Sequence, residues 1–259
     1  MTPPTVDTAL LQRAAADIAR SRRTLALTGA GISVESGIPP FRGKGGLWEK
    51  IDPMKYAHID ALVKDPETVW RVLIKDMKEV LDRARPNDAH RGLARLEEMG
   101  LLQTVITQNI DGLHQAAGSR DVIEFHGSFA RQRCMDCGRK MATADVELHE
   151  LPPRCRCGGV LRPEAIFFGE LIPPEHLLRS QQLAAACDTM LVIGTSAVVQ
   201  PFASLPVIAR GAGATVIEIN PEKTPLTGEI SDYLLAGKAG QVMRALVDII
   251  EKELRETRP

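Results

Sequence analysis

Apolar residues along the chain fall into two alternating patterns, short unbroken runs and longer stretches with helical spacing. Leu11, Ala14 and Ile18 recur every three or four positions, which predicts an amphipathic helix over residues 8–20. The run Thr24–Thr28 is short, apolar and followed by glycine, as in a buried strand that ends in a tight turn. Similar runs predict strands at 105–107, 122–125, 190–193 and 215–219, and helical spacing predicts helices at about 87–99 and 242–254. Short strands that alternate with helices indicate an α/β fold, a doubly wound parallel sheet covered on both faces.

Two segments interrupt this alternation, and we expect them to form a smaller lobe. Residues 43–82 contain no obvious strand and carry both tryptophans, Trp48 and Trp70. Residues 127–165 carry four cysteines together with several prolines and glycines. Neither segment has the pattern of a βαβ unit, so both are predicted to be insertions into the larger domain.

Composition and charge exclude several classes of protein. The 259 residues are 44% hydrophobic and 25% charged, which is ordinary for a globular chain that buries its own core. The net charge of −1 and the 4% of aromatic residues argue against a nucleic-acid-binding protein. No run approaches the roughly 20 apolar residues of a membrane span, and residues 1–7 do not resemble a signal peptide. We therefore expect a cytoplasmic protein with no membrane or nucleic-acid partner. The sequence does not identify the oligomeric state, and a monomer is favoured.

The segment after the first strand, residues 29–43, combines glycines, serines and prolines with Phe41 and Arg42. Glycines at a strand-to-helix turn let the backbone approach a phosphate, and free N–H groups at the helix start bind its charge. The third glycine of the fingerprint G-x-G-x-x-G would fall at Val34, so a nicotinamide dehydrogenase is disfavoured. Within this segment, Arg42 can supply charge to a pyrophosphate and Phe41 a ring to a ribose or nicotinamide face.

Polar residues also follow the later strands of the predicted sheet. Gln108, Asn109 and Asp111 come directly after the second strand, where doubly wound sheets bind ligands, although a polar loop that caps the next helix fits equally well. His126 ends the third strand and could act as a general base, whereas a lone histidine is more often structural. The later strands are followed by Gly194, Thr195, Ser196 and Asn220, as turn residues or as nucleotide contacts.

Four of the cysteines are spaced as metal ligands. Cys134-x2-Cys137 precedes Cys155-x-Cys157 by 17 residues (138–154), close to the zinc pattern C-x2-C, 15–20 residues, C-x2-C, although the second pair is one residue short. Four thiolates at such spacing form a closed tetrahedral site, which makes the metal structural rather than catalytic. His149 is a spare ligand if the second pair cannot bind through both thiols. Disulfides and free thiols are the alternatives.

Together these motifs resemble those of the sirtuins, NAD-dependent protein-lysine deacylases. The resemblance runs in order over residues 26–240: the glycine segment, Gln-Asn-Ile-Asp, His-Gly, the cysteine pairs, Phe-Gly-Glu, Gly-Thr-Ser and the late asparagine. It implies a Rossmann-like NAD domain made of residues 1–42, 83–126 and 171–259. It also implies a small domain made of a helical insertion at 43–82 and a zinc ribbon at 127–170. NAD and an acyl-lysine protein substrate would meet in the cleft between them.

The resemblance also implies roles for individual residues. The expected catalytic residues are His126, as general base, and Asn109. The expected NAD-binding residues are Gly29, Ala30, Gly31, Ser33, Glu35, Pro39, Phe41, Arg42, Trp48, Gln108, Asn109, Ile110, Asp111, His126, Gly194, Thr195, Ser196, Asn220, Pro221 and Ala239. The substrate peptide is expected to add as a strand beside Ile166, Phe167, Phe168, Gly169 and Glu170, with Val198 and Val199 on its other side. A structural Zn²⁺ is expected on Cys134, Cys137, Cys155 and Cys157.

The implied reaction yields nicotinamide, O-acyl-ADP-ribose and free lysine. An amide oxygen is a poor nucleophile, so the acyl oxygen must be held against C1′ of the nicotinamide ribose. Such positioning is worth on the order of 7–11 kcal/mol of the barrier. A ribose hydroxyl then attacks the resulting alkylamidate, with His126 as its general base.

Three features depart from the sirtuin pattern. Pro40 replaces the Asp or Thr that many relatives have before Phe-Arg, which affects the flexibility of the cofactor loop, residues 29–43. The short Cys155-x-Cys157 spacing affects the geometry of the metal site. Relatives that prefer succinyl or malonyl groups carry Tyr-x-x-Arg where this chain has Leu73 and Asp76, so Asp76 would repel an acidic acyl group. We therefore predict removal of acetyl or other neutral acyl groups. The alternatives are desuccinylation, long-chain deacylation, mono-ADP-ribosyl transfer, and a catalytically silent zinc-ribbon binding module.

Overall fold

The structure, a computed structural model, describes residues 7–43 and 45–257. Residues 1–6, which hold most of the segment examined for a signal peptide, lie outside this range, as do Lys44 and residues 258–259. Within the described residues, no helix is both long enough and apolar enough to cross a membrane.

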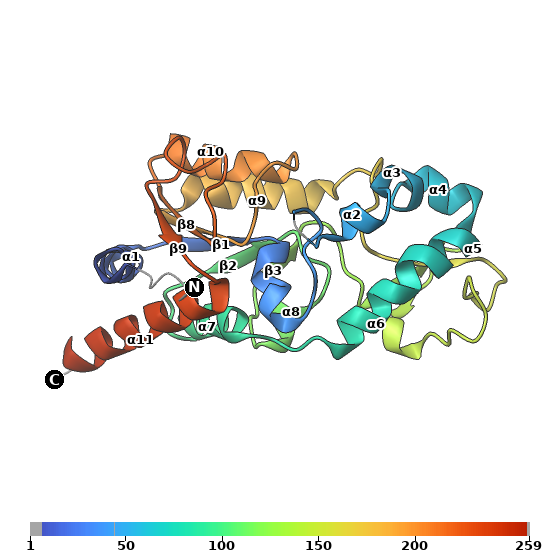
Figure 1. Ribbon diagram of the computed structural model, residues 1–259, viewed down its shortest axis with the longest axis horizontal. Helices are drawn as coiled ribbons and strands as arrows, with labels where there is room; N and C mark the ends of the chain where they lie inside the picture. Colours follow the sequence, from blue (N-terminus) through green and yellow to red (C-terminus); the bar gives the residue numbers. More distant parts are fainter. Residues whose placement is uncertain (1–6, 44, 258–259) are drawn as a thin grey trace.

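The centre of the molecule is a six-stranded parallel sheet with the strand order β3-β2-β1-β7-β8-β9 (Figure 1). The strands are β1 (Thr24–Thr28), β2 (Thr104–Thr107), β3 (Val122–Glu124), β7 (Thr189–Ile193), β8 (Thr215–Asn220) and β9 (Tyr233–Ala236). Strand β1 pairs with both β2 and β7, so the order of the chain reverses between β1 and β7. Doubly wound sheets bind their ligands at such a reversal, beyond the carboxyl ends of the strands.

Helices cover both faces of this sheet (Figure 1). One face carries α1 (Thr8–Arg20), α7 (Asp88–Glu98) and α11 (Ala239–Thr257), and the other carries α9 (Pro174–Ala186) and α10 (Leu205–Gly211). In β1, Ala26 packs toward the first group, whereas Leu25 and Leu27 pack toward the second. Because both faces are covered, every residue of β1 is buried, and the strand reads as an unbroken apolar run.

A smaller part, here called the small lobe, lies at one end of the molecule (Figure 1). It contains the helical elements α2 (Leu47–Lys50), α3 (Pro53–Tyr56), α4 (Ile59–Lys64), α5 (Pro66–Val69), the π-turn η2 (Trp70–Ile74) and α6 (Lys75–Arg83). It also contains an antiparallel sheet of β4 (Arg131–Cys134), β5 (Lys140–Ala142) and β6 (Leu161–Pro163). The short 3₁₀ turn η3 (Thr143–Asp145) comes directly after β5 in the chain. Trp70, 1% exposed, joins the two pieces, because its Nε1 donates to the carbonyl oxygen of Leu161 at 2.9 Å.

The predicted fold class, a doubly wound parallel sheet with a smaller second unit, is confirmed. The helix predicted over residues 8–20 is α1, and the helices predicted at 87–99 and 242–254 are α7 and α11. Strand β9 was not predicted, because its four residues pair only with β8 at the edge of the sheet and follow an irregular loop.

Candidate active site

Two glycine turns meet at the point where the sheet reverses. The turn after β1 leads into the 3₁₀ turn η1 (Ala30–Ser36), and Gly31 N–H in it donates to Gly194 O, after β7, at 2.7 Å. A Cβ on Gly31 would lie 2.7 Å from Gly194 Cα. Gly194 itself has a φ of +59°, and a Cβ there would lie 2.3 Å from the backbone N of Ile32. Only glycines allow this contact, which keeps the start of η1 open to a ligand.

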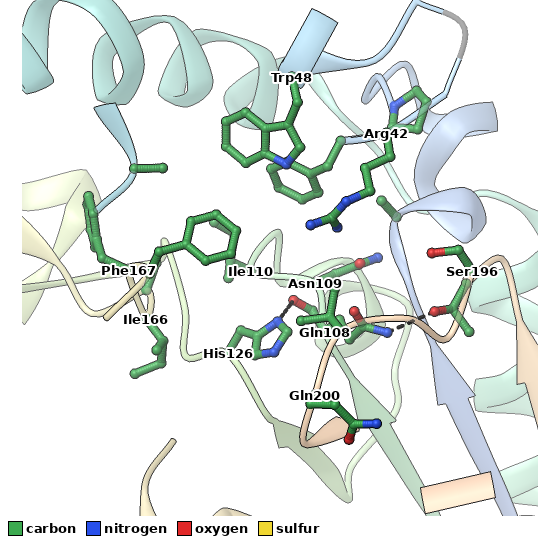
Figure 2. A pocket seen from close by; sticks show the side chains of 18 of the residues that line it. Arg42, Trp48, Gln108, Asn109, Ile110, His126, Ile166, Phe167, Ser196 and Gln200 are labelled. Carbon is green, nitrogen blue, oxygen red and sulfur yellow. Dashed lines mark hydrogen bonds between the residues drawn. The ribbon is translucent and has the colours of Figure 1, made fainter. Parts of the chain in front are cut away.

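Beside these turns lies a cleft of about 960 Å³, within the range of ligand-binding cavities (Figure 2). The predicted NAD-binding residues that line it are Ala30, Gly31, Phe41, Arg42, Trp48, Gln108, Asn109, Ile110, His126, Gly194, Thr195, Ser196 and Asn220. The predicted peptide-binding residues that line it are Ile166, Phe167, Phe168, Gly169, Glu170 and Val199. The structure thus brings together residues from the ends of five strands, β1, β2, β3, β7 and β8, and from the small lobe.

Other predicted residues lie beside or beneath this cleft rather than along its wall. They are Gly29, Ser33, Glu35, Pro39, Asp111, Val198, Pro221 and Ala239. Ser33 is 1% exposed, and its Oγ donates to Asp111 Oδ2 at 2.7 Å. Glu35 accepts from the backbone N–H of Gly240 at 2.7 Å, which fastens η1 to the start of α11. These side chains support the wall of the cleft.

His126 follows β3 and lies on the wall of the cleft (Figure 2). Its Nδ1 is 3.2 Å from the carbonyl oxygen of Gln108. A carbonyl oxygen can only accept, so this contact assigns the ring proton to Nδ1 and leaves the lone pair of Nε2 free. Burial lowers the pKa of His126, and the hydrogen bond to Gln108 opposes this only in part. The ring is therefore held neutral with an available proton acceptor, as a general base requires.

Asn109 presents an unpaired acceptor at the same wall. The residue is 4% exposed, and its Nδ2 donates to Gly29 O and to Ser33 Oγ, both at 3.1 Å. Its buried Oδ1 has no hydrogen-bond partner among the described residues. A buried acceptor without a partner is costly, so this oxygen is suited to an N–H or O–H group of a bound ligand.

Aromatic rings and one cation flank the entrance. Phe41 stacks on Trp48 with ring centroids 5.3 Å apart, and Trp48 lies 6.3 Å from Phe168. The Arg42 side chain is exposed, and its guanidinium points into the cleft toward Asn109 (Figure 2). This arrangement offers positive charge to a phosphate beside flat apolar surfaces that suit a sugar or a nicotinamide ring.

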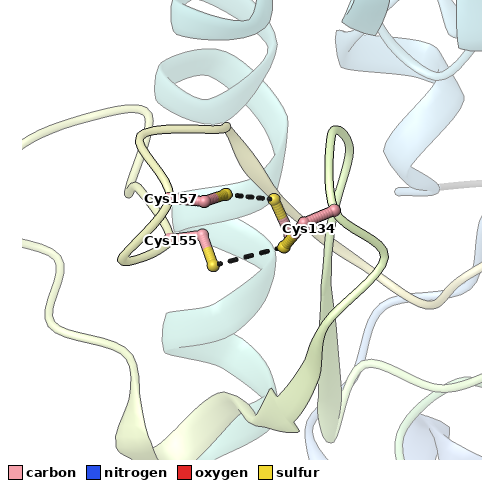
Figure 3. Close-up of side chains that lie close together, drawn as sticks. Cys134, Cys155 and Cys157 are labelled. Atoms are coloured by element: carbon pink, nitrogen blue, oxygen red, sulfur yellow. Dashed lines mark hydrogen bonds between the residues drawn. The ribbon is translucent and has the colours of Figure 1, made fainter.

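The four predicted zinc ligands converge in the small lobe (Figure 3). Their sulfur atoms all lie within 4.8 Å of one another, with Cys134 and Cys157 at 3.5 Å and Cys137 and Cys155 at 3.8 Å. Disulfide sulfurs would be about 2.05 Å apart. A tetrahedral ion with bonds of about 2.3 Å needs sulfurs about 3.8 Å apart, so the residues fit a structural zinc ion. The spare ligand His149 is outside this cluster, with its side chain 87% exposed.

Comparison with known proteins identifies the family. A model described as the Sir2 family matches residues 29–201. The chain is 48% identical over 239 residues to NAD-dependent protein deacylase 2 of Pyrobaculum aerophilum, covering 92% of this chain and 95% of that one. The chain belongs to the Sir2 family. The predicted resemblance to the sirtuins is therefore confirmed.

Solved structures of Sir2 proteins agree with this assignment. A Sir2 homologue in complex with NAD has a TM-score of 0.86 at 46% identity, with 98% of this chain and 97% of that chain covered. A Sir2 variant with a deacetylated p53 peptide and 3′-O-acetyl ADP ribose has a TM-score of 0.85 at 36% identity, with 92% and 97% covered.

One end of the cleft in this Sir2 protein is apolar, and of its residues only Leu73 was named from the sequence, as one of two positions beside the acyl group. The residues at this end are Ala57, Leu73, Ile74, Met77, Phe129, Pro163 and Ala165. Asp76, predicted to repel an acidic acyl group, is exposed and does not line the cleft. The prediction that Asp76 faces the acyl group is wrong, because η2 is a π-helical turn with more residues per turn than an α-helix. The residue that lines the cleft one turn after Leu73 is therefore Met77 and not Asp76.

The opposite end of the cleft is lined by Glu222, Lys223, Thr224 and Pro225, which follow the predicted Asn220. Glu218 in β8 holds this loop from below. It is 1% exposed and accepts from the hydroxyls of Thr224, Thr227 at 2.7 Å and Ser231 at 2.6 Å. A charged residue inside an otherwise apolar strand could have indicated a role, but its hydroxyl partners depend on how the loop folds back.

Two further residues that sequence reasoning missed lie beneath the glycine turn. His90 in α7 and His114 in α8 (Leu113–Ala116) are 0% and 1% exposed, with ring centroids 4.9 Å apart. His114 Nε2 lies 2.9 Å from Thr28 Oγ1, and His90 Nε2 lies 3.4 Å from Ser33 Oγ. The two rings thus connect Thr28, the last residue of β1, to Ser33, whose Oγ also accepts a hydrogen bond from Asn109.

Proposed function

We propose that this NAD-dependent protein deacylase removes acetyl and other neutral acyl groups from protein lysines, in the cleft described above. The observation that carries the proposal is the position of His126. Its ring lies on the wall of the cleft, between the glycine turns and residues 166–170, and its Nε2 is free to accept a proton. The names of the relatives support it, since the Pyrobaculum aerophilum protein is a deacylase and the peptide complex contains 3′-O-acetyl ADP ribose.

In this proposal, NAD spans the sheet reversal. Its pyrophosphate lies at the turn of Gly29 and Gly31, near the open backbone of η1, with Arg42 as counter-charge. Its adenosine lies toward Asn220 and its nicotinamide ribose toward Asn109, whose unpaired Oδ1 accepts from it. This direction brings C1′ of the nicotinamide ribose close to His126.

The reaction then follows from where each group is held. The acyl oxygen of the modified lysine attacks C1′ as neutral nicotinamide leaves, and the cleft holds the two reacting atoms together. The 2′-hydroxyl of the ribose next attacks the acyl carbon, and His126 Nε2 takes its proton. The lysine nitrogen takes up a proton and leaves as the free amine, and water adds to the acyl carbon in its place. The bond from that carbon to the oxygen on C1′ then breaks, which leaves 2′-O-acyl-ADP-ribose. A positioned general base is typically worth about 10²–10⁴-fold in rate. Because burial lowers the pKa of His126, the ring is already unprotonated at neutral pH.

The peptide has one open edge to pair with. Ile166 N–H donates to His126 O and Phe168 N–H to Ala57 O, both at 2.9 Å, so this edge of the segment is already paired. On the other edge, Gly169 N–H has no partner among the described residues. We infer that the substrate backbone adds as a strand through Gly169 and the neighbouring carbonyl groups.

The apolar end of the cleft supports a neutral acyl group. Leu73 and Ile74 are 4% and 2% exposed and line it together with Met77 and Phe129. A carboxylate placed there would lose its hydration without gaining a cationic partner, which is costly. The same lining favours longer apolar chains as a second candidate substrate class.

The test compares acetyl-, decanoyl- and succinyl-lysine versions of one peptide with NAD, measuring deacylated peptide and O-acyl-ADP-ribose by mass spectrometry. We expect activity on the acetyl and decanoyl peptides that is lost in His126→Ala, and little on the succinyl peptide. Faster removal of succinyl than acetyl would contradict the proposed acyl preference. Label transfer from NAD to protein without deacylation would instead indicate ADP-ribosyl transfer.

A further inference from the structure

We propose that Arg162 and Glu170 form a clamp that sets the path of the peptide-binding segment, residues 165–170. Both are positioning residues, because they act through this segment and do not react. The inference rests on the proposed function, in which this segment pairs with the substrate. It gives Glu170, expected to touch the peptide, a different role.

The guanidinium of Arg162 binds residues at both ends of this segment, Ala165 and Glu170. Arg162 lies in β6 and is 3% exposed. Its Nη1 and Nη2 donate to the two carboxylate oxygens of Glu170, each at 2.7 Å. Nη2 also donates to Ala165 O at 2.7 Å, and Nε donates to Pro163 O at 3.0 Å. One rigid side chain thereby binds both ends of the segment, a geometry that a lysine cannot reproduce.

The middle of the segment is held by the same pair. The guanidinium carbon of Arg162 lies 4.8 Å from the centre of the Phe167 ring. Glu170 Oε2 accepts a further hydrogen bond from the backbone N–H of Phe167 at 2.9 Å. Both carboxylate oxygens are therefore engaged within the protein, although Glu170 lines the cleft. The carboxylate orients the strand rather than offering itself to the substrate.

The clamp matters for the reaction because of what the segment joins. Ile166 N–H is bonded to the backbone carbonyl of His126, and Phe168 pairs through its N–H and C=O with Ala57 and Ile59 of the small lobe. Gly169 lies between the attachment at Phe168 and Glu170, which the clamp holds, so the clamp fixes the far side of the open edge. Releasing it would shift the open edge relative to His126, while the glycine turns proposed to hold NAD make no contact with the clamp.

The experiment measures steady-state constants for an acetyl-lysine peptide and for NAD in Arg162→Lys and Glu170→Gln. Arg162→Lys keeps the buried charge, so it remains informative if Glu170→Gln does not fold. The matched control is Glu164→Gln. This change breaks pairs of the same kind in the same module, with Arg131 at 2.8 Å and Lys140 at 2.7 Å, outside the clamp.

We expect the KM for the peptide to rise about ten- to a hundredfold in both clamp variants, because a shift of about 1 Å is enough for such a loss. The KM for NAD and the zinc content should match wild type, and the control should behave as wild type. A lower kcat with both KM values unchanged would show a merely structural role and overturn the proposal, as would unchanged constants.

Direct binding separates this inference from the proposed function. Affinity of each variant for a fluorescent acetyl-lysine peptide is measured by anisotropy, without turnover. If wild type binds the peptide but does not deacylate it, the proposed function fails, and weaker binding by the clamp variants still supports the clamp. Equal binding by wild type and both variants overturns the clamp alone.

Discussion

Two buried histidines, His90 and His114, make the fold sensitive to acid. Burial, assisted by repulsion from Arg91, lowers the pKa of His90 to about 4. Burial, assisted by repulsion from His90, lowers the pKa of His114 to about 3. The folded protein therefore keeps both rings neutral at pH values where the unfolded chain, with histidine pKa values near 6.5, takes up protons.

The sign and size of the effect follow from these values. Because both pKa values are lowered on folding, their stability contribution is complete above pH 6.5 and is lost as the pH falls from 6.5 toward the folded-state values. Between about pH 7.5 and about pH 5.5, each histidine removes about 1.4 kcal/mol from the free energy of unfolding, and the pair about 3 kcal/mol. Burial raises the pKa of nearby Asp111, and a carboxyl pKa that is raised on folding acts in the opposite direction to the two histidines. A loss of about 3 kcal/mol is a large part of a typical domain stability of about 5–15 kcal/mol.

The assay is urea unfolding at both pH values, for wild type and for His114→Gln. Glutamine can keep a hydrogen bond to Thr28 Oγ1, which lies 2.9 Å from the ring of His114, but it does not titrate. The variant should lose about 1.4 kcal/mol less than wild type on acidification. His149→Gln, at a side chain 87% exposed, is the control and should lose as much as wild type. An equal loss in His114→Gln and wild type would refute the reasoning.

Four further predictions concern the site and its supports. Removing zinc with a chelator should abolish deacylation and disorder β4–β6, as followed by circular dichroism, with recovery on adding zinc. Because burial lowers the pKa of His126 and the base must be neutral, kcat should stay level as the pH falls to 6.5 and decline only below it. Gly194→Ala should raise the KM for NAD about tenfold or more, because its Cβ would lie 2.3 Å from Ile32 N. Glu218→Gln should loosen the hydroxyl-bound loop and raise the KM for NAD without changing that for the peptide.

Each of these predictions has an outcome that contradicts it. Full activity of the metal-free protein would rule out a structural zinc, and a pH midpoint above 6.5 would mean that burial does not control His126. Gly211→Ala is the control for Gly194→Ala, because a Cβ there meets nothing within 4 Å. An equal change in the two glycine variants would contradict the steric argument. A rise in the peptide KM of Glu218→Gln would assign Glu218 a different role.

Elements with a long or repeated pattern could be predicted from the sequence. Helix α1 spans Thr8–Arg20, as its apolar spacing indicates, and the buried run Thr24–Thr28 is the central strand. The helices α2–α5 contain only four to six residues, too few to establish a helical period. The order of the sheet and the pairing of β9 depend on contacts between distant segments, which no local pattern contains.

The residues of the candidate site likewise include some that could be predicted from the sequence and some that could not. Parallel strands bring their carboxyl ends to one edge, which places His126, Asn109 and Gly194 near one another, whereas their roles were implied by the resemblance to the sirtuins. Met77 and Phe129, which were not predicted, line the cleft because the helical insertion packs against the zinc-binding module. The error at Asp76 arose from assuming α-helical spacing through a π-turn.

The account depends most on the coupling of NAD cleavage to deacylation at His126. The direct measurement is the molar ratio of nicotinamide released to acetyl-lysine peptide deacylated, in wild type and in His126→Ala. We expect one nicotinamide for each deacylated peptide in wild type, no nicotinamide without acylated peptide, and loss of deacylation in the variant. Deacylation without nicotinamide release, or undiminished deacylation in His126→Ala, would contradict the account.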